Sequence, residues 1–166
     1  ANLSGMDIRT ATPVDWARIY PFYSVIVEAG ESYAFPLGQS EQEACPWLME
    51  QPPGHTVVAT NDGAVLGTAK MGPNRPGRGA HVATASFMVD PAHRGKGVGR
   101  ALGEYALRWA RRAAYVSMQF NAVVETTTDA VHLWKSVGFD ITGTVPAPFD
   151  HLPPGRVRHP VLSQRL

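Results

Sequence analysis

Apolar residues in the first third of the chain recur at helical spacing, which predicts two helices there. The first stripe consists of Trp16, Ile19, Tyr23, Ile26 and Val27. Thr12 followed by Pro13 is typical of a helix start, and Ser40 can cap a second helix that runs to about residue 51. Pro21 interrupts the first stripe, so we expect it to kink or split that helix.

The rest of the chain alternates short apolar runs with two further helical stripes. The predicted strands cover residues 6–10, 56–60, 64–71, 81–89, 117–125, 139–145 and 157–164, and the later helices cover 100–114 and 128–137. Asn61-Asp62-Gly63 predicts a hairpin turn, and four prolines between residues 145 and 157 predict a loop. This order of elements indicates a mixed α/β domain, of the α+β kind.

Composition narrows the class of protein without identifying it. The chain has 166 residues, 44% of them hydrophobic and 17% charged, which fits one globular domain over residues 6–166. Residues 1–5 precede Met6 and could be a cloning remnant or a disordered tail. A net charge of +1 gives no basic field for nucleic acid, and the sequence has no apolar run long enough for a membrane span. Cys45 is the only cysteine, so we expect a cytoplasmic protein without internal disulfides.

The most informative segment runs from Val89 to Arg100 and links a predicted strand to a predicted helix. Gly95, Gly97 and Gly99 remove the Cβ atoms that would hold a phosphate away from the backbone. The amides and the positive end of the helix then form an environment that suits a pyrophosphate. A solvated basic turn is the other interpretation of this segment. A P-loop is excluded because no GxxxxGK[ST] occurs, and the sequence shows no His/Cys spacing typical of a metal site.

Two motifs resemble those of the GNAT superfamily of N-acetyltransferases. The first motif matches at Val89, Pro91, Arg94, Gly95, Gly97 and Gly99, and the second matches at Ala130, Leu133, Gly138 and Phe139. The resemblance implies a single domain with a mixed, mostly antiparallel sheet of about six to seven strands and about four flanking helices. It also implies that the fourth and fifth strands splay apart, and that acetyl-CoA serves as co-substrate without a metal.

The resemblance assigns cofactor contacts residue by residue. The backbone of Phe87, Met88 and Val89 would pair with the pantetheine arm, and an amide near Met88 would stabilise the oxyanion. The pyrophosphate would be held by Arg94, Gly95, Lys96, Gly97, Val98, Gly99 and Arg100. Thr127 stands where the family commonly has an asparagine that contacts the cofactor arm, and its hydroxyl could replace part of that contact. Asn121, on the polar face of its strand, could bond the pantetheine or the acceptor, or could instead make an internal hydrogen bond.

The catalytic acid and base are not evident from these motifs. Trp134 stands where the family commonly has a tyrosine acid, and Ala85 and Ser86 stand where many members carry a glutamate base. Glu125 is the candidate base at the end of its strand; the alternative is a solvated glutamate. Without such groups, catalysis would depend mainly on positioning of the reactants.

The acceptor is expected to be the amine of a small molecule. The family usually shapes this pocket from the first two helices and their loop, which here supply Glu28, Glu31, Tyr33 and Phe35. Two carboxylates and two aromatic rings would suit a cationic amine, and an ordinary surface loop is the other interpretation. An acyl-CoA-binding module without turnover and a protein-lysine or N-terminal acetyltransferase are the competing functions. A homodimer is also compatible with the sequence.

Overall fold

The computed structural model describes residues 5–121, 123, 128–151 and 155–166. Its helices are α1 (Pro13–Glu28), α2 (Glu41–Leu48), α3 (Val98–Arg112) and α4 (Thr128–Ser136). Its strands are β1 (Asp7–Thr10), β2 (His55–Asn61), β3 (Ala64–Pro73), β4 (Val82–Val89), β5 (Ser117–Phe120), β6 (Asp140–His151) and β7 (Gly155–Arg165). Two 3-10 turns, η1 (Gly77–Gly79) and η2 (Pro91–His93), flank β4. None of the described helices is long and apolar enough to cross a membrane.

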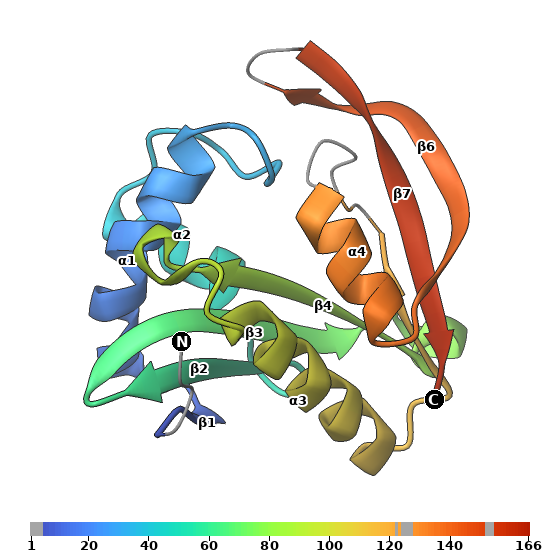
Figure 1. Ribbon diagram of the computed structural model, residues 1–166, viewed down its shortest axis with the longest axis horizontal. Coiled ribbons are helices and arrows are strands. Elements are labelled where there is room, and N and C mark those ends of the chain that lie inside the picture. The colour runs from blue at the N-terminus through green and yellow to red at the C-terminus, as the bar shows by residue number, and fades with distance from the viewer. Residues whose placement is uncertain (1–4, 122, 124–127, 152–154) are drawn as a thin grey trace.

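The strands form one seven-stranded sheet with the order β1-β2-β3-β4-β5-β7-β6. Among the strand pairs of the described residues only β4–β5 is parallel, so the expected mixed and mostly antiparallel sheet is confirmed. Helices α1 and α2 cover one face through an apolar core around Ile19 and Leu48. Helices α3 and α4 cover the other face through Leu102 and Trp134 (Figure 1).

Strands β4 and β5 part soon after they meet. β4 pairs with β5 only at Val82 and Ala83, whereas its seven paired residues with β3 extend to Val89. The expected splay between the fourth and fifth strands is therefore confirmed. Beyond Ala83, one backbone edge of β4 has no strand beside it among the described residues, and α4 lies near the gap (Figure 1).

Two segments that contain proline differ from expectation: Pro21 does not split the first helix, and the expected proline loop is largely strand. Helix α1 continues past Pro21 to Glu28, because Phe22, Tyr23 and Ile26 on the second half of the helix are buried against the sheet. The expected proline loop is instead largely strand: β6 continues to His151. β6 lies at the sheet edge, where a proline removes no ladder hydrogen bond, and its register shifts between Val145 and Phe149.

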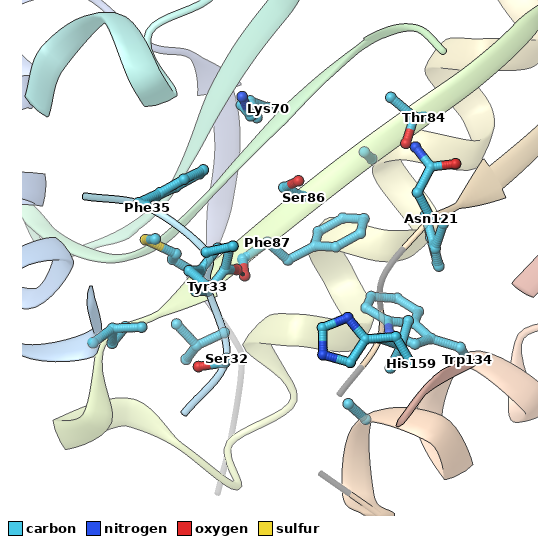
Figure 2. Close-up of a pocket in the computed structure, with 18 of the residues that line it drawn as sticks. Ser32, Tyr33, Phe35, Lys70, Thr84, Ser86, Phe87, Asn121, Trp134 and His159 are labelled. Carbon is cyan, nitrogen blue, oxygen red and sulfur yellow. Dashed lines mark hydrogen bonds between the residues drawn. The ribbon is translucent and has the colours of Figure 1, made fainter. Parts of the chain in front are cut away.

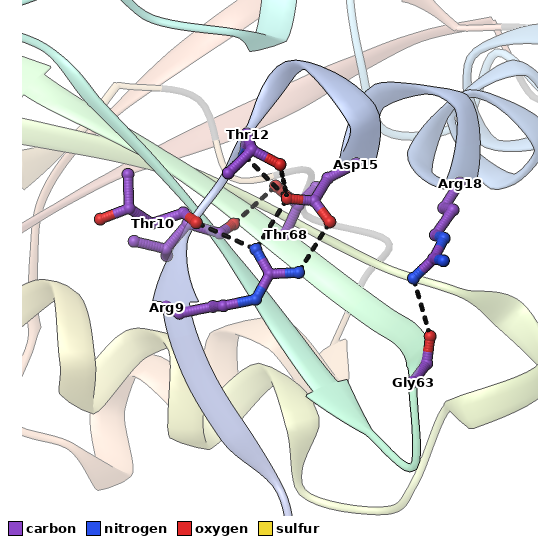
Figure 3. Close-up of polar contacts among 8 residues, drawn as sticks. Arg9, Thr10, Thr12, Asp15, Arg18, Gly63 and Thr68 are labelled. Carbon is purple, nitrogen blue, oxygen red and sulfur yellow. Dashed lines mark hydrogen bonds and ion pairs between the residues drawn. The ribbon is translucent and has the colours of Figure 1, made fainter.

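An ion pair fixes the start of α1 against β1. The side chain of Asp15 is only 1% exposed, and both of its oxygens accept hydrogen bonds from the Arg9 guanidinium, at 2.7 and 2.8 Å (Figure 3). The backbone N–H and the hydroxyl of Thr12 also donate to this carboxylate. These hydrogen bonds, with Arg9 the largest contributor, hold the pKa of Asp15 well below its usual range despite burial, which acts in the opposite direction.

We predict that Asp15→Ala lowers the free energy of unfolding by about 2 kcal/mol at pH 7, because it removes the acceptor of several charge-assisted hydrogen bonds. A lowered pKa stabilises the fold above the unfolded value of about 4, and this stabilisation is lost as the pH falls below it. Urea titrations between pH 7 and pH 3 measure both effects. The exposed Asp7→Ala is the matched control, and an equal loss in both variants would contradict the prediction.

Candidate functional site

A cavity of about 440 Å³ lies where β4 leaves β5, and it passes through the gap between them. The wall that belongs to the α3 side of the sheet includes Phe87, Val89, Ala130 and Trp134. The wall on the α1 side includes Ile26, Tyr33, Phe35 and Met88. The cavity therefore connects the two faces of the sheet, and a ligand on each face could meet at the gap.

Along β4, the backbone N–H and C=O groups of successive residues point alternately toward β3 and toward the gap. The Asn74 N–H donates to the Val82 carbonyl, and the Asp90 N–H donates to the Leu66 carbonyl. Both contacts join β3 to β4, and the register between them has no shift, so Met88 exchanges its backbone hydrogen bonds with Thr68. The backbone N–H and C=O of Phe87 and Val89 point the other way, into the gap. Met88, expected as the oxyanion donor, thus directs its N–H into the sheet.

Tyr33 reaches this exposed edge from the loop between α1 and α2. Its hydroxyl donates a hydrogen bond to the backbone carbonyl of Phe87, and its ring lies against Phe35 with 5.3 Å between centroids. Burial raises the pKa of Tyr33, so the phenol remains protonated and acts as a donor at neutral pH. A carbonyl has two lone pairs, so Phe87 can accept a second hydrogen bond from a ligand.

The glycine-rich turn presents a row of backbone donors at the far end of β4. Gly95 and Gly97 have φ values of 73° and 81°, a left-handed conformation that favours glycine. The first backbone bond of α3 is from the Ala101 N–H to the Gly97 carbonyl. Among the described residues, the N–H groups from Gly95 to Arg100 donate no hydrogen bond. The turn therefore offers unsatisfied amides together with the positive end of a helix.

The three basic side chains of the turn have different surroundings. Arg94 lines the cavity. The Lys96 ammonium lies 3.3 Å from the Ala92 carbonyl, so it remains close to the turn itself. Arg100 donates to the hydroxyl of Ser136 at 2.7 Å, which ties α3 to α4. Arg94 is therefore the basic side chain of this turn that reaches the cavity.

Trp134 packs as an aromatic wall between the gap and α3. Its ring centroid lies 4.6 Å from that of Phe87 and 5.0 Å from that of Phe120, and the residue is 6% exposed. A Cβ atom at Gly103 would lie 2.5 Å from the Trp134 ring, so α3 needs a glycine there to admit the indole. An indole N–H cannot serve as an ionisable acid.

Some of the remaining expected site residues line the cavity and others do not. Asn121 lines the cavity, but its side chain also donates to Asn74 and accepts from Gln119. Glu28 does not line the cavity, and its carboxylate accepts the Gly38 N–H. Glu31 is exposed and does not line the cavity either. Glu125 and Thr127 lie outside the described residues, and their roles stay predictions.

Sequence reasoning missed several polar residues of the cavity wall. Lys70, Thr84 and His159 line it, and His159 is 4% exposed (Figure 2). Lys70 is a single charged residue within the otherwise apolar strand β3, which is a signal that the sequence alone offered. His159 carried no comparable signal, because its place beside the gap depends on how β7 pairs with β5.

The chain belongs to the acetyltransferase (GNAT) family, which its residues 16–139 match. The predicted family is therefore confirmed, and with it the class of enzyme.

Individual relatives agree with this assignment. The fold is similar to a GCN5-related N-acetyltransferase from Kribbella flavida, with a TM-score of 0.94 and 48% identity over 99% of this chain and 100% of that one. It is also similar to yncA from Salmonella typhimurium, solved with its cofactor acetyl-CoA, with a TM-score of 0.81, 26% identity and coverage of 100% and 95%. N-acetyltransferase aca1 from Schizosaccharomyces pombe is 37% identical over 82 residues, 49% of this chain, and this match spans 39% of that relative's length.

We predict that Trp134 and Gly103 are coupled through packing. Gly103→Ala should destabilise the protein by about 1–3 kcal/mol, because the new methyl group overpacks the indole. In the Trp134→Phe background the smaller ring leaves room, so the same change should cost at least about 1 kcal/mol less. Urea unfolding of the four proteins of this cycle measures the coupling. Additive losses would contradict the proposed contact.

Proposed function

We propose that this protein transfers the acetyl group of acetyl-CoA to the amine of a small molecule. The observation that carries the proposal is the alignment of an unpaired β4 edge with the amide-rich turn at its end. A pyrophosphate at the Gly95–Arg100 amides would place the attached pantetheine arm beside Phe87 and Val89, whose backbone groups it can pair with. The cavity volume of about 440 Å³ is within the range of small-molecule sites, which supports a small acceptor over a protein.

The proposed reaction is a direct attack of the amine nitrogen on the thioester carbon. A C–N bond forms, the C–S bond breaks, and the products are the acetamide and free CoA. The amine proton passes to a base, and the leaving thiolate, a weak base with a thiol pKa near 8.5, takes a proton from solvent. We propose the Phe87 N–H as the oxyanion donor in place of Met88, because the β4 register directs it into the gap.

We propose His159 as the group that receives the amine proton. The imidazole lines the cavity from β7, and Figure 2 shows it on the side of the gap opposite Tyr33. No Asp or Glu lines the described part of this cavity, so an imidazole is the available base there. Glu125 stays the alternative base, with solvent as the acceptor if neither side chain acts.

The phosphate site predicts a specific binding defect. Acetyl-CoA should raise the melting temperature of the wild-type protein, because it binds only the folded state. Gly97→Glu should abolish this rise by placing a bulky anion among the amides. Gly97→Ala shares the strain at a positive φ but adds no charge, and Gly143→Glu adds the same charge in open space on β6. Gly143→Glu should retain the full ligand-induced rise in differential scanning fluorimetry, whereas Gly97→Ala should retain a reduced rise, because its methyl group occupies part of the cradle. A normal response from Gly97→Glu would show that the pyrophosphate binds elsewhere.

The base is tested by the pH dependence of kcat/KM with an amine found by screening. His159→Gln should lower kcat/KM by about a hundredfold, since general base catalysis contributes about this much. It should also remove the limb of the pH–rate profile that reports the ionisation of an enzyme group. Glu125→Gln should cost less than about tenfold and leave the limb in place. The reverse pattern would assign the base to Glu125. Equal, small effects would leave the proton to solvent, and binding without any turnover would favour the acyl-CoA-binding module.

A further inference from the structure

Three polar residues lie side by side where β3 and β4 face the acceptor half of the cavity. The register places Lys70 directly opposite Ser86, and Thr84 is two residues from Ser86, on the same face of β4. All three line the cavity, and Figure 2 shows Lys70 on the side of Phe35, Thr84 on the side of Asn121 and Ser86 between them. Directly opposite residues such as Lys70 and Ser86 have Cβ atoms about 5 Å apart, and Thr84 is a diagonal neighbour of Lys70 at about 7–8 Å. A ligand group held by Lys70 and Ser86 therefore lies within reach of the Thr84 side chain.

The two hydroxyls are available to a ligand. Thr84 and Ser86 are both partly buried, and neither side chain hydrogen-bonds another described residue. Neither hydroxyl oxygen is a buried atom that lacks a partner, so water can reach both, and a ligand with acceptor atoms can replace that water.

Lys70 adds a positive charge to this face. Its side chain is 23% exposed; the ammonium lies 3.2 Å from Glu50 and 5.7 Å from the centre of the Phe35 ring. An ammonium has three N–H donors, so the Glu50 contact leaves others for a bound oxyanion. Glu50 is not part of the cavity wall, whereas Lys70 is.

The charged side chains in the cavity wall favour an acceptor that carries a negative charge. Its described walls contain the cations Lys70 and Arg94 and no carboxylate. Arg94 adjoins the phosphate turn beyond the end of β4, whereas Lys70 pairs three residues before that end, about 10 Å away along the strand. The two cations therefore lie toward different ends of the cavity, and at the Lys70 end the ammonium faces the ligand while its partner Glu50 lies outside the wall.

We propose that the acceptor is an amine that also carries an oxyanion, such as the carboxylate of an amino acid, and that Lys70, Ser86 and Thr84 bind this group. The inference rests on the proposed acetyl transfer and names the substrate class of the same site. With the oxyanion at Lys70, the amine can lie toward the Phe87 edge, where the thioester would be. Glu28 and Glu31, which the sequence suggested for a cationic amine, do not line the cavity, and this favours the oxyanion as the recognised group.

Matched substrate pairs test the inference. Each L-amino acid is compared with its own C-terminal amide, and kcat/KM is corrected for the fraction of free amine. The wild-type protein should prefer at least one free carboxylate over its amide by about tenfold or more, and spermidine should be a poor substrate. Lys70→Met should remove this preference mainly by raising KM for the free carboxylate. Lys70→Arg should restore part of the preference, and the exposed Lys135→Met should behave as wild type.

Binding measurements distinguish a failure of the oxyanion site from a failure of the proposed acetyl transfer. The same pairs are titrated by calorimetry into the protein saturated with CoA, with and without Ser86→Ala. If carboxylates bind in a way that depends on Lys70 and Ser86 but are never acetylated, the acetyl transfer fails and the oxyanion site stands. If amides or spermidine are acetylated or bound as well as carboxylates, or if Lys70→Met leaves the preference intact, the oxyanion site is overturned.

Discussion

Beyond Ala83, one edge of β4 has no described strand paired with it, and the site depends on this open edge. Backbone N–H and C=O groups inside a protein need hydrogen-bond partners, and a strand in the middle of a sheet normally finds them on both sides. Here β3 satisfies one edge as far as Val89, while the edge of Phe87 and Val89 faces a cavity. An extended ligand at this edge could therefore supply the hydrogen-bond partners that a neighbouring strand would otherwise provide.

The surrounding elements maintain the gap and furnish its two ends. Trp134, seated on Gly103, supports Phe87 from the α4 side, and Tyr33 donates to the Phe87 carbonyl from the opposite side. The free amides of the Gly95–Arg100 turn mark the end suited to phosphate, and Lys70 marks the end proposed for the acceptor. A cationic side chain lines the cavity toward each end, Arg94 near the turn and Lys70, with Glu50 as its partner, on β3.

Features that depend on a short segment alone could be predicted from the sequence. Features that depend on how strands pair could not. The turn from Gly95 to Gly99 was recognisable because its chemistry is local. The continuation of β6 through its prolines was not, since it depends on β6 being an edge strand. The direction of the Met88 N–H and the pairing of Lys70 with Ser86 both follow from the β3–β4 register, which no single strand reveals. His159 joins the wall for the same kind of reason, through β7.

Amide hydrogen exchange, resolved by NMR, tests the central claim most directly. The account predicts that acetyl-CoA slows exchange at the Phe87 and Val89 N–H groups, which face the gap in its absence. The Met88 N–H, already bonded to Thr68, should exchange slowly with or without the cofactor. Unchanged exchange at Phe87 and Val89 in a protein saturated with acetyl-CoA would contradict the claim that the open β4 edge binds the cofactor arm.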